Sequence, residues 1–374
     1  MIIIFSGFNM RAVYAFLRTL EKHHLSYAII ASSENDEVFE TSYKNKVVTI
    51  RDYLELDLDD VVKAIKQVQL ATKSSNYFIA PSTEALNRFL VENRERIEAL
   101  DCIIPLVEKS MYEEISDKYK FGDLCNTFDI TTPAEYSMED INLPCVAKPR
   151  TYFGKKSNRI LKPVIIQFPD DLEIFLAEHD IEEFYFQEFI SGKSLYLLYY
   201  FYQDEACLKY SQENLIQQRG GGSILAAKSS DFHLSDYSKC FENLFQSINF
   251  SGLVMVEVKY FNDQMYMIEA NPRFWGPSQL FVDAGINFFE ALLYDYGFLN
   301  KQPESAIAPH QLIYYFWDDG ESFIGNAIDT TAFHDYSKQQ FLIKHDDLNK
   351  INILKKRDTM AIYNKLIQGN KNEK

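Results

Sequence analysis

Short apolar runs alternate with amphipathic segments along the first third of the chain. Residues 11–22 and 58–70 repeat apolar side chains at helical spacing, which predicts two helices there. Strands that alternate with helices are typical of a parallel sheet with helical crossovers. We therefore predict one α/β domain over residues 1–110. Its expected strands are residues 2–5, 27–31, 46–50, 77–80 and 102–106.

Beyond residue 110 the strands become more aromatic and fewer helices separate them. This change predicts an α+β region with a small module over residues 111–187 and a larger antiparallel part over residues 188–300. Residues 301–374 have a mixed pattern and end in a polar tail, which is expected to fray from residue 369. The expected helices are residues 111–125, 170–179 and 235–249, and the expected strands are residues 144–148, 183–189, 195–202, 206–211, 253–260, 265–270 and 312–317.

Two apolar runs on either side of Asn262-Asp263 predict a β-hairpin. Side chains two positions apart on a strand share a face. Glu269 and Asn271 are therefore expected on one face of the hairpin, together with Met265 and Met267.

The first strand of this hairpin carries a further carboxylate, Glu257. A loop with an odd number of residues, for instance three centred on Asp263, would place Glu257 opposite Glu269, and an even loop would separate them. Facing carboxylates repel each other, and a divalent cation removes the repulsion. Two carboxylates and the amide oxygen of Asn271 are hard ligands that suit Mg²⁺ or Mn²⁺. The hairpin therefore predicts a metal site, and Arg273 supplies a fixed cation for a phosphoryl group or an acyl phosphate.

The simpler interpretation of the same residues is an ordinary hairpin with exposed acids. An isolated Glu-x-Asn sequence favours that interpretation, and the rest of the chain has to decide between the two.

Composition narrows the class of protein. The chain has 374 residues, of which 47% are hydrophobic and 25% charged, so it is long enough for two or three packed domains. A net charge of −16 argues against nucleic acid or an anionic membrane as the main partner. Five scattered cysteines indicate neither a disulfide framework nor a zinc site. The opening apolar run is too short for a signal peptide or a membrane span, so a cytoplasmic location is expected.

Five motifs follow one another in a fixed order along residues 117–273. They are Asp117-Lys118, Val146-Ala147-Lys148-Pro149, Phe186-Gln187-Glu188-Phe189-Ile190-Ser191-Gly192, Val256-Glu257 and Ile268-Glu269-Ala270-Asn271-Pro272-Arg273. In this order the chain resembles the ATP-grasp superfamily over residues 1–300, and within it the carbamoyl-phosphate-synthase-like and amino-acid-ligase branch. The resemblance implies an N-terminal parallel-sheet domain, a small lid domain at 111–187 and a larger antiparallel-sheet domain with the metal site at 188–300.

The resemblance also implies an ATP site. Its expected residues are Lys118 and Lys148 on the phosphates, Gln187, Glu188, Phe189 and Ile190 as a hinge for adenine, Ser194 on the ribose, and Lys155 in a lid loop. Lys148 ends an apolar strand, where its charge needs a partner such as a phosphate. The lid loop has one glycine where relatives often have several, and Ser194 stands where relatives often have an acid.

A glycine-rich stretch adds one more candidate. Arg219 precedes Gly220-Gly221-Gly222, and it could bind a carboxylate or a transferring phosphate. A flexible hairpin connection explains the same residues equally well.

The function that the resemblance implies is an ADP-forming ligase that joins a carboxylate to an amine or a thiol. Arg273, Lys148 and Arg219 are the expected catalytic residues, with ATP and Mg²⁺ or Mn²⁺ as cofactors. The expected partners are small carboxylate and amine substrates, and a homo-oligomer is compatible with the sequence. Two alternatives are kept: a non-catalytic nucleotide-binding scaffold, and an enzyme that activates bicarbonate as carboxylases do.

Overall fold

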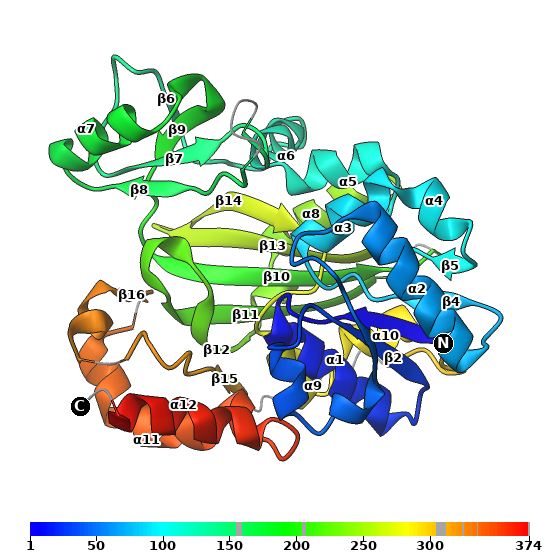
Figure 1. The fold of residues 1–374 in the computed structure, drawn as a ribbon. Helices are drawn as coiled ribbons and strands as arrows, with labels where there is room; N and C mark the ends of the chain where they lie inside the picture. Colours follow the sequence, from blue (N-terminus) through cyan, green and yellow to red (C-terminus); the bar gives the residue numbers. More distant parts are fainter. Residues whose placement is uncertain (155–158, 204–206, 304–311, 324, 335, 373–374) are drawn as a thin grey trace.

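The chain folds around three β-sheets. The computed structural model describes residues 1–154, 159–203, 207–303, 312–323, 325–334 and 336–372. Figure 1 shows the N-terminal sheet and the small sheet beside different parts of the larger central sheet. No helix within these described residues is long and apolar enough to cross a membrane.

Aliphatic strands build the parallel N-terminal sheet, in the order β3-β2-β1-β4-β5. Strands β1 (Ile2–Phe5), β2 (Tyr27–Ala31) and β4 (Tyr77–Ile79) are buried at every position, as parallel strands with helices on both faces are. The order reverses between β1 and β4, and ligands of such sheets bind at the carboxyl ends of the strands flanking this point. The other elements are β3 (Val47–Ile50), β5 (Cys102–Ile103), α1 (Met10–Lys22), α2 (Leu58–Thr72), α3 (Glu84–Glu92) and α4 (Arg94–Glu98).

The small module is a four-stranded antiparallel sheet with one covering helix. Its order is β6-β9-β7-β8, and the aromatic side chains of β9 pack against α7 in a separate core. The elements are β6 (Glu135–Tyr136), β7 (Cys145–Pro149), β8 (Val164–Ile166), β9 (Phe184–Glu188) and α7 (Pro169–Glu178).

The single helix predicted over residues 111–125 is wrong, because the structure has two. Helix α5 (Lys109–Ser116) ends before Asp117, and α6 (Lys118–Asn126) begins after it. The Asp117 carboxylate accepts hydrogen bonds from the N–H groups of Tyr119 and Lys120, which caps α6. The cap fixes Lys118 at the first position of α6.

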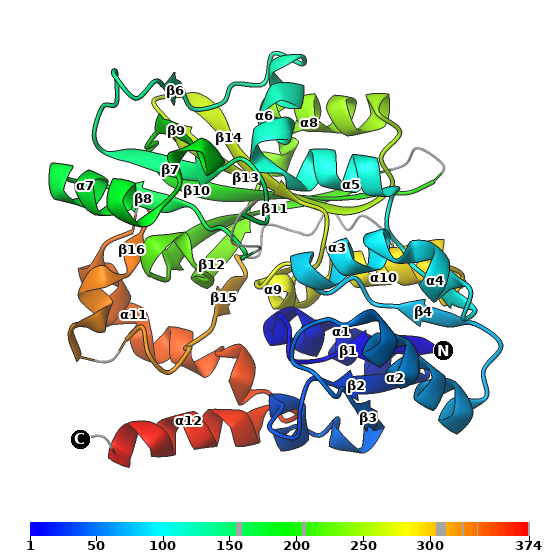
Figure 2. The ribbon, with the colours of Figure 1, turned by 45° about the horizontal axis from the view of Figure 1, so that its top comes forward.

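The large sheet is antiparallel and has the order β14-β13-β10-β11-β12-β15, with β16 paired to β11. One face packs against α5, α6 and α8, as Figure 2 shows, and the other packs against α1, α9 and α10. Its elements are β10 (Lys193–Phe201), β11 (Cys207–Gln217), β12 (Ile224–Ser230), β13 (Gly252–Phe261), β14 (Gln264–Asn271), β15 (Tyr314–Phe316), β16 (Ala332–Phe333), α8 (Asp236–Ser247), α9 (Ser278–Asp283) and α10 (Phe288–Asp295). This combination of parallel and antiparallel sheets confirms the predicted fold class.

The C-terminal extension adds the strands β15 and β16 to the large sheet and then two helices, α11 (Lys338–Lys350) and α12 (Met360–Asn372). Helix α12 continues to Asn372, and the fraying predicted from residue 369 stays a prediction. Short 3₁₀ helices lie at Glu37–Glu40, Lys44–Lys46, Ile181–Glu183, Arg219–Gly221, Phe232–Leu234, Gly325–Thr330 and Ile353–Lys355.

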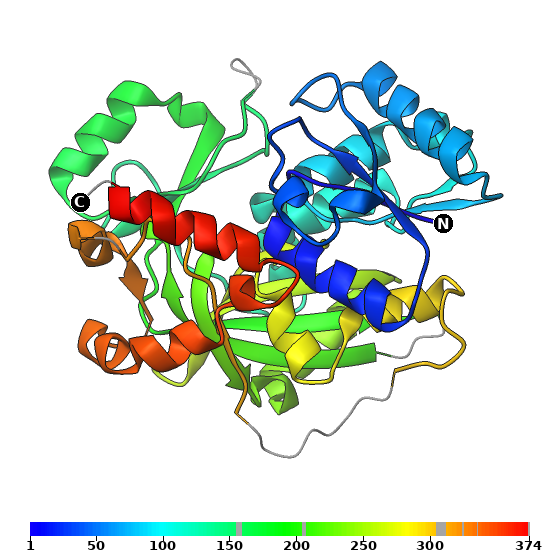
Figure 3. The ribbon, with the colours of Figure 1, turned by 60° about the horizontal axis from the view of Figure 1, so that its bottom comes forward.

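Arg18 on α1 fastens the extension to the N-terminal domain. Its guanidinium lies 2.9 Å from the Asp358 carboxylate, and it also donates to the Ile353 carbonyl and to Thr359. Another of its nitrogens donates to Gln279 at 2.7 Å. Figure 3 shows the resulting arrangement, in which α12 begins beside the N-terminal domain and runs away from it.

We expect Arg18→Met to lower the free energy of unfolding by about 2–4 kcal/mol, because it leaves the partly buried Asp358 without its cation. Urea unfolding measures the loss, and limited proteolysis should cut the extension faster. Lys365→Met is the control: its exposed pair with Glu40 should be worth less than about 1 kcal/mol. Equal effects of the two substitutions would contradict this account.

Candidate functional site

A β-bulge brings Glu257 and Glu269 face to face. The hairpin loop has two residues, Asn262 and Asp263, with φ of 49° and 59°, so the loop is even. The expectation that an even loop would separate the two acids is wrong. An uninterrupted ladder from this loop would pair Glu257 with Ile268. The register shifts by one residue between Val258 and Glu257, so Glu257 pairs with Glu269. The predicted juxtaposition therefore occurs through an extra residue in β14.

The bulge also changes which side chains share a face. Met265 and Met267 lie in the core beneath α8, together with Ala270. The prediction that both methionines share the face of Glu269 is therefore wrong, because the extra residue Ile268 reverses the alternation between them.

Two lysines reach the carboxylate pair from outside the large sheet. Lys118, at the start of α6, forms an ion pair with Glu269. Lys148, on β7 of the small sheet, is only 5% exposed and donates to the carbonyl of the bulge residue Ile268 at 3.1 Å. Within the described residues, Lys148 forms no ion pair. A buried ammonium held only by a carbonyl is ready to take an anionic ligand.

A third cation, Lys259, lies two positions after Glu257 on β13. It is on the same face as Glu257, and its ammonium is 3.1 Å from Nδ1 of His334. The alternation of side chains could have identified Lys259 from the sequence. His334 carries no such signal, because it is 75 residues away in the chain.

The two carboxylates differ in their affinity for a proton. Burial and the charge of Glu269 raise the pKa of Glu257 to about 7. Burial would raise the pKa of Glu269 as well, but Lys118, Asn271 and Arg273 outweigh it and lower that pKa to about 2. Burial and the charge of Lys118 lower the pKa of Lys148 to about 8, against the opposing carboxylates.

Asn271 lies beside the pair, but its amide nitrogen faces the acids. Nδ2 donates to Glu269 at 2.7 Å, and Oδ1 accepts from Arg273 at 3.0 Å. The donors that fit a hard divalent ion in this geometry are therefore the oxygens of Glu257 and Glu269. The described residues contain no cluster of three histidine, cysteine or acidic side chains that could hold a metal ion. Ligation by Asn271 stays a prediction.

Arg273 joins the site to the N-terminal domain. Its guanidinium donates to the Phe274 carbonyl at 2.9 Å and lies 3.8 Å from Glu84 on α3. Glu84 also accepts hydrogen bonds from Arg88 and Tyr112. The segment that follows β4, where Glu84 lies, is thus beside the hairpin that carries Glu257 and Glu269.

The hinge residues connect the two antiparallel sheets. Strand β9 ends at Glu188 and β10 begins at Lys193. Gln187 is buried, and its Oε1 lacks a hydrogen-bond partner within the described part of the chain. Ile190 is also buried, whereas Phe189 is partly exposed. These residues form the connection between the two sheets, and adenine binding by them stays a prediction.

Ser194 has a different neighbour from the one expected. Its hydroxyl is fully buried, donates to Glu257 at 3.3 Å, and accepts from Asn214 at 3.0 Å. Ser194 and Asn214 therefore orient the Glu257 carboxylate, and the ribose contact stays a prediction. Asn214 is a site residue that the sequence did not reveal.

Two of the predicted residues are not assembled with the carboxylates. Arg219 is exposed in the 3₁₀ helix that connects β11 and β12, and no contact joins it to Glu257 or Glu269 in the described residues. Lys155 lies outside the described residues. The preceding lid residue Tyr152 is described, and its ring lies 4.6 Å from the Arg88 guanidinium.

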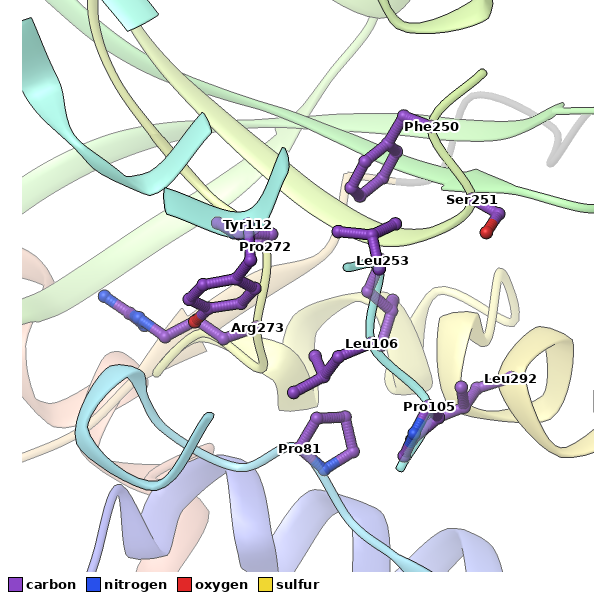
Figure 4. A pocket seen from close by; sticks show the side chains of 11 residues that line it. Pro81, Pro105, Leu106, Tyr112, Phe250, Ser251, Leu253, Pro272, Arg273 and Leu292 are labelled. Atoms are coloured by element: carbon purple, nitrogen blue, oxygen red, sulfur yellow. The ribbon is translucent and has the colours of Figure 1, made fainter. Parts of the chain in front are cut away.

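A small apolar pocket lies beside Pro272, which directly follows β14. Pro81, Leu106, Tyr112 and Leu253 are among its lining residues. Figure 4 shows the Arg273 guanidinium directed away from its centre. This pocket is therefore separate from the carboxylate site.

Comparison with known proteins identifies the domain and the fold. Residues 115–277 match the family model of the ATP-grasp domain. No curated protein sequence matches the chain significantly.

Three solved structures show the same fold. Biotin carboxylase from Campylobacter jejuni has a TM-score of 0.61 at 13% identity over 81% of this chain and 72% of that one. N5-carboxyaminoimidazole ribonucleotide synthetase from Thermus thermophilus has a TM-score of 0.56 at 15% identity, with 79% and 78% covered. Pyruvate carboxylase from Rhizobium etli has a TM-score of 0.60 at 14% identity over 81% of this chain, which spans only 29% of that longer chain. Residues 115–277 are thus an ATP-grasp domain, and the chain has the ATP-grasp fold that its motifs predicted.

Proposed function

We propose that the protein is an ATP-dependent, ADP-forming ligase that activates a carboxylate as an acyl phosphate for attack by an amine or another nucleophile. The observation that carries the proposal is the facing pair Glu257 and Glu269, with the ammonium groups of Lys118 and Lys148 converging on it. Two acids that face each other across neighbouring strands destabilise a sheet, so a hairpin without a ligand gains no stability from them.

The nucleotide would span the two antiparallel sheets. Gln187 to Ile190 would receive the base, and Lys118 and Lys148 would bind the phosphates by exchanging Glu269 and the Ile268 carbonyl for phosphate oxygens. Glu257 and Glu269 would hold Mg²⁺ or Mn²⁺, which when bound neutralises phosphate charge during transfer.

The substrate carboxylate would lie near Arg273, which already links the metal hairpin to Glu84. Its oxygen attacks the γ-phosphorus, the bond from the γ-phosphorus to the bridging oxygen breaks, and ADP leaves. The nucleophile then attacks the acyl carbon, loses a proton, and releases phosphate. The residues bind, orient and balance charge, and no side chain is needed as a nucleophile.

Bicarbonate is a second candidate for the activated acid. The solved structures that match this chain include biotin carboxylases, and one of the matching structures contains MgADP and bicarbonate. Bicarbonate and larger acids would share the same nucleotide and metal residues, so only the acceptor differs.

We expect wild-type protein to form ADP and phosphate from ATP when the correct acid and nucleophile are both present. A panel of amino acids, small acids and bicarbonate, followed by a coupled ADP assay, tests this. Glu269→Gln should lower turnover about 100-fold or more because it removes a metal ligand. Glu242→Gln on α8, whose partner is Lys209, is the control and should leave turnover unchanged. Formation of AMP, or nucleotide binding with no turnover under any condition, would contradict the proposal.

We expect Lys148→Met to weaken MgADP binding about 10-fold or more, because the substitution leaves phosphate charge unpaired in a buried site. Isothermal titration calorimetry gives the dissociation constant. Lys209→Met is the matched control, because Lys209 lies on the other face of the large sheet from Glu257 and pairs with Glu242 on α8. Equal affinities of the two variants for MgADP would argue against a phosphate at Lys148.

We expect Glu257→Gln to stabilise the metal-free protein at pH 8 by about 1–3 kcal/mol relative to wild type. The pKa of Glu257 is raised to about 7 in the folded state, so wild type loses stability as pH rises from its unfolded value near 4.5 through 7. Urea unfolding in EDTA at pH 5 and pH 8 measures the difference. A gain that shrinks with rising pH would show that Glu257 is not destabilised by its own charge.

A further inference from the structure

A strip of polar side chains crosses the large sheet from the carboxylates of Glu257 and Glu269 to the C-terminal extension. Glu257 and Lys259 lie two positions apart on one face of β13. Ser194 on β10 lies opposite Lys259 in the ladder and donates a hydrogen bond to Glu257. Asn214 on β11 continues the strip through its bond to Ser194. Beyond it lies His334, which directly follows β16; Figure 1 shows this segment against the β11–β12 hairpin. A segment distant in sequence therefore reaches the face that carries Glu257.

The contacts of His334 define its protonation. Its Nε2 lies 2.8 Å from Oε1 of Gln217, and the Gln217 amide is oriented by its bond to the Gly222 carbonyl. A lysine ammonium can only donate, so Nδ1 of His334 is the acceptor facing Lys259 and Nε2 carries the proton. Burial and the charge of Lys259 lower the pKa of His334 to about 3, which agrees with a neutral ring. The backbone N–H of His334 also donates to Leu215.

Lys259 is a cation with spare donors. It forms no ion pair among the described residues, and it is partly buried on the same face of β13 as Glu257. Its ladder partner Ser194 comes four residues after Ile190 of the hinge. Lys259 therefore lies between the residues that would receive the base and those that would hold the metal. The ribose and the α-phosphate of a nucleotide would have to cross this position.

We propose that His334 is a positioning residue of the nucleotide site, and that it holds the Lys259 ammonium where Lys259 binds the α-phosphate of a nucleoside diphosphate or triphosphate. This inference rests on the proposed function. It makes the C-terminal extension part of the binding site, because the extension supplies the hydrogen-bond acceptor for Lys259.

The test measures MgADP affinity by isothermal titration calorimetry. Lys259→Met should weaken binding about 10-fold, as loss of a charged hydrogen bond does, and His334→Leu should do the same. His334→Asn keeps an acceptor near the place of Nδ1 and should recover affinity to within about 3-fold of wild type. The double variant that combines K259M with H334L should bind no more weakly than K259M alone, because the two side chains act through one contact.

His345→Leu is the matched control in the same extension. His345 packs against Phe341 and Phe316, and within the described residues it makes no contact with Lys259, so MgADP affinity should not change. Thermal unfolding of every variant separates loss of affinity from loss of fold.

Two results would overturn the inference. Wild-type affinity in both K259M and H334L, with or without a lower melting temperature, would show that the pair only anchors the extension. A Kd for H334N as weak as that for H334L would show that the acceptor at Nδ1 does not matter. The proposed function fails in a different way: wild-type protein would then bind no MgADP, or Lys148→Met would bind it unchanged.

Discussion

The repulsion between Glu257 and Glu269 is the constraint around which the site is organised. Two carboxylates opposite each other on neighbouring strands would normally weaken the sheet. Here the strain is balanced by cations from three parts of the chain: Lys118 from α6, Lys148 from the small sheet and Lys259 from β13 itself. Besides burial, the charge of Glu269 raises the pKa of Glu257, and the charge of Lys118 lowers the pKa of Lys148. The arrangement is costly without a ligand and suited to one that carries both a divalent cation and phosphates.

The fold contributes by bringing distant segments to one place. The small sheet delivers Lys148, the capped start of α6 delivers Lys118, and the N-terminal domain delivers Glu84 to Arg273. The extension is held against the N-terminal domain by Arg18 and against the large sheet by β16. Each of these docking contacts is made by elements outside the hairpin, so the geometry of the acids depends on how the domains pack.

Much of this could be predicted from local patterns. The alternating strands and helices indicated the parallel sheet, and the order of motifs indicated the ATP-grasp fold. The pairing of the two acids was expected only for an odd loop, but a two-residue turn combined with a bulge gives the same register. A bulge at Ile268 has no distinctive sequence, and the capping of α6 by Asp117 was hidden in a continuous helical pattern. Asn214 and His334 become site residues only through long-range pairing, which a single sequence does not encode locally.

The hydrogen bond from Lys148 to the Ile268 carbonyl connects the small sheet directly to the bulge. A phosphate that binds the Lys148 ammonium in place of this carbonyl would remove the hydrogen bond between the small sheet and the bulge. Without a ligand, the Ile268 carbonyl oxygen occupies the position of the phosphate oxygen on Lys148. This neutral acceptor satisfies the buried ammonium but binds it more weakly than an anion would. Phosphate binding at Lys148 would therefore be coupled to the position of the small sheet relative to the large sheet, because both depend on which acceptor the ammonium bonds.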